Sequence, residues 1–272
     1  MHAVVCIKQV PDTTEIRVDP ETGTLVRKGV PSIVNPYDMH AVEEAVRLKE
    51  RHGGRVTLLS MGPPQAEAAL RKAMTLGADR IVLLTDRAFA GSDTLATSYV
   101  LAAAIARISR EEPVDLVLCG KQAIDGDTGQ VGPGIAARLG LPPLTYVMEI
   151  ESIDLEAGEV VVHRTLAGGR EVVRSSLPAL ITVGKDINRI RYASLPNMLR
   201  ALEAPLETWG KEDVEVEPER LGLRGSPTNV SKVFPPPRRS GGEVIPGGPE
   251  DPEGAARTLV EKLVSLKVLA DV

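Results

Sequence analysis

The residues best suited to chemistry in this chain are gathered between residues 119 and 134. This segment, CGKQAIDGDTGQVGPG, starts at the end of an apolar run and leads into a helical pattern. Its five glycines permit tight turns and let backbone N–H groups come close to a ligand. The start of the helix would add unpaired N–H donors and a positive dipole end, which suit a phosphate. The segment is neither a Walker A loop nor GxGxxG, so phosphate binding and a plain strand–loop–helix connection are equal alternatives.

Two aspartates in this loop, Asp125 and Asp127, complicate the phosphate hypothesis. Their carboxylates would repel a phosphate unless a cation or a hydroxyl lies between them. They could instead cap the helix or accept hydrogen bonds from a ribose or from the main chain. Thr128 and Gln130 offer further side-chain hydrogen bonds.

Polar residues also follow the other predicted strands, where they would face the same edge of a parallel sheet. Asn35 is a good helix cap and Pro36 suits the first helical position, so capping alone accounts for both. Capping also accounts for Asp93, which precedes the helix after the third strand. Their common location still makes these junctions candidates for a nucleotide pocket. The candidates outside the loop are Lys8, Asn35, Pro36, Tyr37, Asp38, Met61, Asp93, Thr94 and Thr97.

The elements that must position these residues alternate along the first ~145 residues. Apolar runs at residues 3–10, 55–60, 80–84 and 114–119 predict strands, and helical patterns follow at 36–52, 66–76, 92–107 and 130–139. Such an alternation predicts an α/β fold with a mostly parallel sheet covered by helices on both faces. Turn residues between 16–18 and 24–26 predict a hairpin. Four short runs at 148–153, 159–163, 171–173 and 179–183 predict an antiparallel addition.

Composition excludes several classes of function. The net charge is −5 and aromatic residues make up 3% of the chain, which argues against nucleic-acid binding. No apolar run approaches the roughly 20 residues of a membrane span, and the N-terminus lacks the pattern of a secretory signal. We expect a soluble, cytoplasmic protein whose two cysteines, Cys6 and Cys119, are reduced and buried.

No acid–base set is evident. No pair of histidine, cysteine, aspartate or glutamate residues has a spacing that suggests a metal site, and no serine lies in a GxSxG elbow. We therefore predict no metal ligands and no catalytic residues. A nucleotide pocket without such a set favours binding or electron transfer over group-transfer catalysis.

Five segments of the chain resemble, in order, the β subunit of electron transfer flavoprotein. They are VVCIKQVPD, NPYDMHAVEEAVRLKE, VDLVLCGKQAIDGDTGQVGPGIAARLGLP, VHRTLAGGREVVRSSLPALITV and INRIRYASLPNMLRA, and together they span nearly the whole chain. The resemblance implies a Rossmann-like fold and a larger α-subunit partner that holds FAD. It also implies a nucleotide in this chain, which is AMP in many members and a second FAD in a flavin-bifurcating branch.

The resemblance assigns roles to particular residues. Leu195, in the segment SLPNM, would dock into an acyl-CoA dehydrogenase, although a buried loop leucine is the plainer explanation. Where AMP-binding members continue with lysines, this chain has RALEA, which puts that contact in doubt. The expected nucleotide site comprises Cys6, Lys8, Asn35, Pro36, Tyr37, Asp38, Met61, Asp93, Thr94, Thr97, Gly120, Asp125, Gly126, Asp127, Thr128, Gly129, Gln130, Val131, Gly132 and Gly134.

Two domains are expected on this basis. Residues 1–232 would form the α/β nucleotide-binding domain, with the antiparallel addition from about residue 146 and a partner-recognition segment at about 186–204. Residues 233–272 contain the proline run 235–237 and a helical pattern at 254–269. They would form an arm and helix that wrap the partner subunit.

The residues 91–98, 125–128 and 226–230, with Pro236, Pro237 and Arg238, resemble the bifurcating branch more than the AMP-binding one. We therefore favour FAD over AMP, with Thr94 and Thr97 on its pyrophosphate. In that branch NADH delivers a hydride to this flavin. One electron then passes to the α-subunit flavin and on to an acyl-CoA dehydrogenase or a quinone reductase, and the other passes to ferredoxin or flavodoxin.

Two rival classes remain. A stand-alone nucleotide sensor of the stress-protein type shares the alternating pattern, but the long C-terminal part argues against it. An adenylating ligase is disfavoured because no catalytic set is visible. With AMP in the pocket, the complex would be a simple carrier from acyl-CoA dehydrogenases to a quinone reductase.

Overall fold

The computed structural model describes residues 1–12, 17–18, 25–26, 31–229, 231 and 242–269. The chain divides into two units, residues 1–233 (unit 1) and residues 234–272 (unit 2), and each is treated by itself. The predicted proline run 235–237, Arg238 and Val230 lie outside the described residues.

Unit 1 is built on a nine-stranded sheet. In chain order its strands are β1 (His2–Cys6), β6 (Arg55–Met61), β7 (Arg80–Leu84), β8 (Leu116–Gly120), β9 (Pro143–Asp154), β10 (Glu159–Leu166), β11 (Gly169–Ser176), β12 (Ala179–Val183) and β13 (Leu206–Trp209). Their order across the sheet is β11-β10-β9-β12-β8-β1-β6-β7-β13. Across the sheet, every neighbouring pair on the path β9-β12-β8-β1-β6-β7-β13 is parallel. β10 pairs antiparallel with both β9 and β11.

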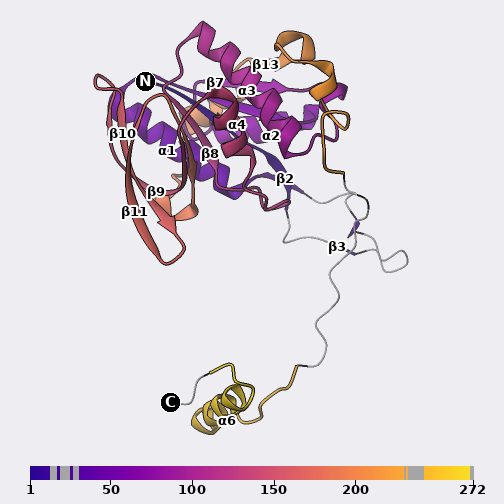
Figure 1. Ribbon diagram of the computed structural model, residues 1–272, viewed down its shortest axis with the longest axis vertical. Coiled ribbons are helices and arrows are strands. Elements are labelled where there is room, and N and C mark those ends of the chain that lie inside the picture. The colour runs from indigo at the N-terminus through magenta and orange to yellow at the C-terminus, as the bar shows by residue number, and fades with distance from the viewer. Residues whose placement is uncertain (13–16, 19–24, 27–30, 230, 232–241, 270–272) are drawn as a thin grey trace. The chain divides into compact units, whose positions relative to one another are not determined.

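Helices pack on both faces of this sheet and are labelled in Figure 1. They are α1 (Pro36–His52), α2 (Glu67–Met74), α3 (Thr94–Glu111) and α4 (Val131–Leu139). Residues alternate between the faces: Ala3 and Val5 of β1 pack with α1 and α2, while Val4 and Cys6 pack with α3 and α4. The predicted α/β class, with a mostly parallel, Rossmann-like sheet covered on both faces and an antiparallel addition, is confirmed.

Two predicted strands behave differently from expectation. The apolar run at 3–10 is divided into β1 and a separate strand, β2 (Gln9–Pro11), which pairs with β5 (Ser32–Val34). The strand β12 was expected in the antiparallel addition, but it pairs parallel to both β8 and β9. All five of its residues are buried, as in a strand covered on both faces. The two strands of the predicted hairpin, β3 (Arg17–Val18) and β4 (Leu25–Val26), pair antiparallel, and residues 19–24 between them lie outside the described residues.

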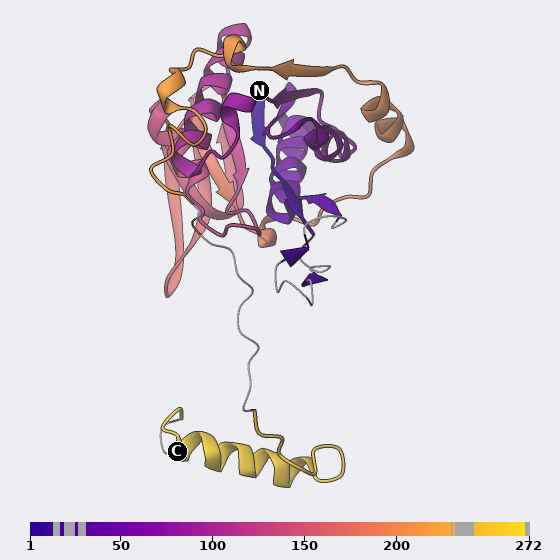
Figure 2. The same ribbon diagram turned by 90° about the vertical axis from the view of Figure 1, so that its right-hand side faces the viewer.

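After β12 the chain makes a long excursion that ends in β13, a strand that the sequence analysis did not predict. Figure 2 shows this excursion along the outside of unit 1, with the helix α5 (Leu195–Glu203) on it. The Arg71 side chain of α2 donates to the Ala201 carbonyl (2.7 Å), and Ala201 is buried. α5 is therefore held against α2.

Unit 2 contains one described helix, α6 (Pro252–Ser265), close to the predicted 254–269. Asp251 caps it by accepting a hydrogen bond from the Gly254 N–H (3.0 Å). None of its residues is buried, although Leu259 in the helix and Leu266, which follows it directly, are large and apolar.

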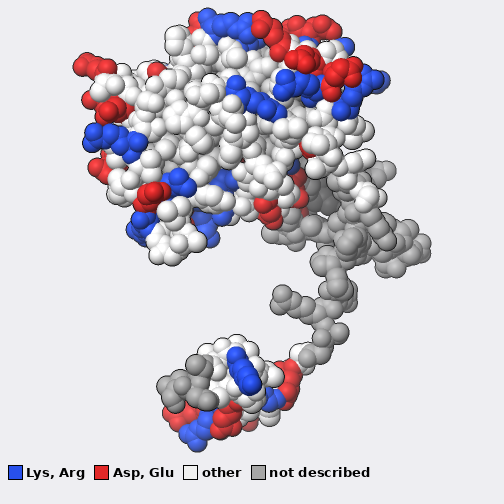
Figure 3. Space-filling model, viewed as in Figure 1, with Lys and Arg blue, Asp and Glu red and all other residues white. Residues whose placement is uncertain are grey.

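On the face of the molecule in Figure 3, basic and acidic side chains of the described residues are interspersed. Among the described helices, none combines the length and the apolar character of a membrane span.

Candidate functional site

The order of the strands reverses beside β1. From β1 the chain goes to β6 and β7 on one side, and then crosses to β8 on the other. In open α/β sheets, ligands bind at the carboxyl ends of the strands at such a switch point. Here those ends are Cys6 and Gly120, and Cys6 lies in register with Cys119.

Asp38, in the first turn of α1, forms hydrogen bonds with residues at the ends of two strands on this edge of the sheet. One carboxylate oxygen accepts a hydrogen bond from the Lys8 backbone N–H (2.7 Å). The other accepts from the Gly120 N–H (3.2 Å) and from the Asn35 side-chain amide (2.9 Å). Burial raises the pKa of Asp38 to about 7, while these hydrogen bonds and the Lys8 charge act to lower it. Asp38 thus joins the ends of β1 and β8 to the start of α1.

Asn35 occupies the N-cap position of α1 and Pro36 the first turn, as predicted, but the side chain of Asn35 makes no capping hydrogen bond. It donates to Asp38 and to the Gln122 carbonyl (2.9 Å), and its oxygen accepts from the Ile124 N–H (3.1 Å). The capping interpretation of this side chain was therefore wrong. Asn35 is fully buried and positions the first half of the 120–130 loop.

The two loop aspartates are both paired with side chains of the protein. Lys8 donates to both carboxylate oxygens of Asp125 at 2.8 Å. The amide of Gln122 donates to Asp127 (2.7 Å), and Asp127 has a positive φ of 52°. These contacts reduce the repulsion that the two carboxylates would exert on an anion.

The starts of α3 and α4 meet at the side of this loop. The Thr94 hydroxyl donates to the side-chain oxygen of Gln130 (2.8 Å), which is the N-cap residue of α4. No side chain caps α4, and within the described residues the N–H groups of Val131 and Gly132 have no acceptor. A helix start with free N–H groups favours an oxyanion.

Asp93 caps α3 and also ties down a distant segment. One of its oxygens accepts from the N–H groups of Leu95 (2.9 Å) and Ala96 (3.0 Å). The other accepts from the Thr228 hydroxyl (2.7 Å) and N–H (3.1 Å). Burial tends to raise the pKa of Asp93, but the hydrogen bonds from Ala96, Thr228 and Leu95 outweigh it and lower the pKa. With both oxygens occupied, Asp93 positions the site rather than offering a free acceptor.

The five glycines of the loop have different roles. A side chain at Gly120 would meet Asp38 at 2.3 Å, one at Gly132 would meet Thr182 at 2.6 Å, and one at Gly134 would meet Ser98 at 2.8 Å. These three glycines make room for protein atoms. Gly129 has a φ of +62°, and Gly126 has open space around it.

The remaining predicted residues lie around the same edge with fewer contacts. Met61 ends β6, and Thr97 is on the second turn of α3, partly exposed. Thr128 is exposed in the loop. Leu195 lies elsewhere, at the start of α5, with 68% of its surface exposed, so the explanation as a buried leucine is wrong.

Lys121 and Tyr146 also belong to this edge, and neither was predicted from the sequence as a site residue. The Lys121 ammonium lies 5.3 Å from the ring of Tyr37 and 5.8 Å from the ring of Tyr146. Tyr146 has a positive φ of 58° and is half exposed, and its hydroxyl is near Gly129. Lys121 could have been noted because it directly follows Gly120, whereas nothing in the sequence singles out Tyr146.

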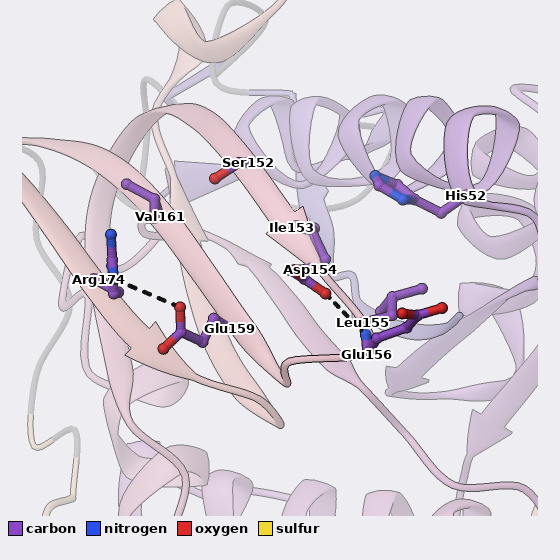
Figure 4. A pocket seen from close by; sticks show the side chains of 9 residues that line it. All are labelled: His52, Ser152, Ile153, Asp154, Leu155, Glu156, Glu159, Val161 and Arg174. Atoms are coloured by element: carbon purple, nitrogen blue, oxygen red, sulfur yellow. Dashed lines mark hydrogen bonds and ion pairs between the residues drawn. The ribbon is translucent and has the colours of Figure 1, made fainter.

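A pocket of about 460 Å³ lies elsewhere, between the end of α1 and the β9–β10 hairpin. Figure 4 shows His52 beside the turn at Leu155 and Glu156, and Arg174 paired with Glu159. It contains none of the predicted site residues. Within the described part of the chain, no cluster of histidine, cysteine, aspartate or glutamate is arranged to hold a metal ion.

Comparison with known proteins gives a consistent result. A family model for the electron transfer flavoprotein domain matches residues 22–214. Protein FixA of Azotobacter vinelandii is 51% identical over 265 residues, which cover 97% of this chain and 94% of FixA. The caffeyl-CoA reductase-Etf complex subunit CarD of Acetobacterium woodii is 49% identical over 248 residues, 91% of this chain and 92% of CarD. The electron transfer flavoprotein subunit beta of Thermoanaerobacterium thermosaccharolyticum is 46% identical over 270 residues, 99% of this chain and 100% of its own length.

Proposed function

Because this chain belongs to the electron transfer flavoprotein family, as an electron transfer subunit of the β type, we propose that it is the small subunit of a heterodimer and binds FAD where α3 and α4 begin. The larger α subunit holds the second FAD. In this proposal NADH is the electron donor, and the electrons divide between the α-subunit flavin and ferredoxin or flavodoxin. AMP is the alternative occupant of the pocket.

The contact between Thr94 and Gln130 carries this proposal. It brings two helix starts together, and the free N–H groups of Val131 and Gly132 lie beside it. A pyrophosphate needs several donors, and a site for two linked phosphates suits FAD better than AMP. The ion pair between Asp125 and Lys8 reduces the repulsion that the Asp125 carboxylate would exert on a bound anion.

The protein residues act by binding and orientation. Thr97 and Thr128 supply hydroxyl donors, and the start of α4 supplies backbone donors. Thr94, whose hydroxyl donates to Gln130, would turn that hydroxyl toward a phosphate when the nucleotide binds. Asn35 and Asp38 hold the loop and the strand ends in place. The isoalloxazine, when bound, supplies the redox chemistry by accepting a hydride and releasing electrons singly. No side chain is assigned a proton-transfer step.

Two surfaces suit protein partners. On α5, Leu195 and Leu202 are 68% and 70% exposed, with Met198 and Leu199 between them, as expected for a segment that docks an acyl-CoA dehydrogenase or a quinone reductase. On α6, the exposed leucines form an apolar side that suits the α subunit.

The test is to co-produce the chain with the product of the neighbouring gene and to quantify flavin in the purified complex. Two FAD per heterodimer support the proposal, and one FAD with released AMP supports the carrier alternative. A chain that purifies without a partner and without flavin would overturn both.

Variants locate the nucleotide. Replacing both Thr94 and Thr97 by valine should reduce the flavin content from two FAD to one. Thr75→Val, at the end of α2, removes a hydroxyl bonded only to the Lys72 carbonyl and should leave the content at two. Equal losses in the two proteins would place the second flavin elsewhere.

A further inference from the structure

A second pocket lies beside the first turns of α3, outside the proposed nucleotide site. Its volume is about 420 Å³, and Arg138, Arg220 and Arg224 contribute to its lining together with Tyr99. Small-molecule sites commonly have volumes of roughly 300–1,000 Å³. Glu219 also lines the pocket, so three arginines face one carboxylate, and the excess of positive charge suits an anionic occupant.

Arg138, on α4, has unused hydrogen-bonding capacity. One terminal nitrogen donates to the Leu95 carbonyl (2.9 Å). Its Nε is buried and finds no acceptor, and no carboxylate of the described residues forms an ion pair with it. Buried polar groups in proteins nearly always have a partner, so this guanidinium is short of an oxygen ligand.

Arg220 and Arg224 approach the pocket from the segment after β13. The Arg220 guanidinium stacks on the ring of Tyr99, 4.1 Å from its centroid, which fixes the plane of its donors. Arg220 is paired with Glu217 at 3.6 Å, and Arg224 with Glu219 at 2.8 Å. Arg220 is 48% exposed and the other three side chains are 69–73% exposed, and exposed pairs of this kind are weak. A stronger anion can therefore displace either carboxylate.

We propose that this pocket binds a phosphate-bearing small molecule, whose phosphate oxygens accept hydrogen bonds from Arg138 and Arg220. The planar fork of an arginine matches two phosphate oxygens. The limited volume argues for a small molecule rather than a peptide segment.

The proposal does not depend on FAD or AMP in the nucleotide site. Leu95, which helps to line the pocket, directly follows Thr94, so the two sites are neighbours on α3. The experiment must therefore separate them.

The test uses the full chain and the NMR signals of the arginine Nε–H groups during a titration with pyrophosphate. The Arg138 signal should shift saturably, and Arg220→Gln should weaken binding at least about tenfold. Arg110→Gln, which removes an exposed arginine that pairs with Glu215 among the described residues, should leave this binding unchanged. If Thr94→Val abolishes the Arg138 shift, the pyrophosphate lies in the nucleotide site and the proposal is overturned.

A parallel titration with inorganic phosphate and with ADP distinguishes the source of the anion. Equal affinity for phosphate and pyrophosphate indicates a simple oxyanion site, and tighter binding of ADP indicates a nucleotide. The proposal is overturned if no saturable shift occurs, or if Arg110→Gln weakens binding as much as Arg220→Gln. Since Arg220 is exposed, its variant tests the site even where Arg138→Gln does not fold.

Discussion

Asp38 shows how one buried side chain can shape a site by binding other parts of the protein. Its two oxygens accept hydrogen bonds from donors of the protein, from Lys8, Gly120 and Asn35. Its role is to hold the two strand ends at a fixed distance from the start of α1.

The Asp38 carboxyl should titrate far from its ordinary value. Burial raises its pKa from 3.8 to about 7, so the folded protein keeps a proton that the unfolded chain has already lost between these pH values. This group therefore makes folding stability fall as pH rises from about 4 to about 7. A carbon-13 NMR titration of the Asp38 side-chain carboxyl measures the midpoint of its titration. Urea unfolding at pH values from about 4 to about 7 tests whether folding stability falls as pH rises. A midpoint below 4 would contradict the expectation.

Two glycine substitutions form a matched pair. Gly134→Ala places a methyl group 2.8 Å from the Ser98 hydroxyl oxygen, where α3 and α4 pack, and should destabilise the fold by about 1–3 kcal/mol. Gly126→Ala meets no atom within 4 Å and should change stability by less than about 0.5 kcal/mol. Urea unfolding measures both. Similar values for the two proteins would show that α3 and α4 are less tightly packed than described.

At the level of elements, the alternation of strands and helices was predictable because continuous apolar runs and helical periods are local properties of the sequence. The order of the strands is not local. The run ALITV of β12 reads the same in either direction of pairing, so its parallel partners could not be foreseen. The candidate site likewise has a part that was predictable from local sequence and a part that was not. The loop and the strand ends were predicted, but the contact of Asn35 with Gln122 and Ile124 joins residues far apart in the chain.

The start of α3 should be sensitive to loss of its cap. Asp93→Ala removes the hydrogen bonds to Leu95 and Ala96 and the tie to Thr228, and should cost about 1–2 kcal/mol. Thr228→Val keeps the cap and removes only the hydroxyl bond. Hydrogen exchange should increase at residues 226–229 in both variants, but in the first turn of α3 only with Asp93→Ala. Faster exchange there in Thr228→Val would show that the tie, not the cap, holds the helix start.

At the scale of the whole molecule, unit 2 is the part whose own contacts bury the least apolar surface. Its helix α6 has no buried residue, yet Leu259 and Leu266 lie seven positions apart and so share one side. An apolar helix side of this kind needs a covering surface. The proposed α subunit would supply it.

This assignment predicts the effect of charge on α6. Replacing Leu259 and Leu266 together by glutamate should weaken association with the α subunit at least about tenfold. Unfolding of unit 1 should be unchanged, because α6 belongs to unit 2. Arg257→Glu is the control, since position 257 is on the opposite side of the helix from Leu259. Co-purification and isothermal titration measure the affinities, and equal effects of both changes would assign the contact to charge rather than to the leucines.

The pairing of Cys6 with Cys119 on the central strands has a practical consequence. Both thiols are buried, and the hydrogen bond with the neighbouring Cys6 thiol, together with burial, raises the pKa of Cys119 well above its usual range. An alkylating reagent attacks thiolates, so it reaches this pair when the edge of the sheet around the two strand ends opens. The rate of alkylation therefore measures how often this edge opens. It needs no engineered label, and it can be read by mass spectrometry in a mixture. The same measurement, made before and after a second subunit is added, would report how much that subunit slows the opening of this edge.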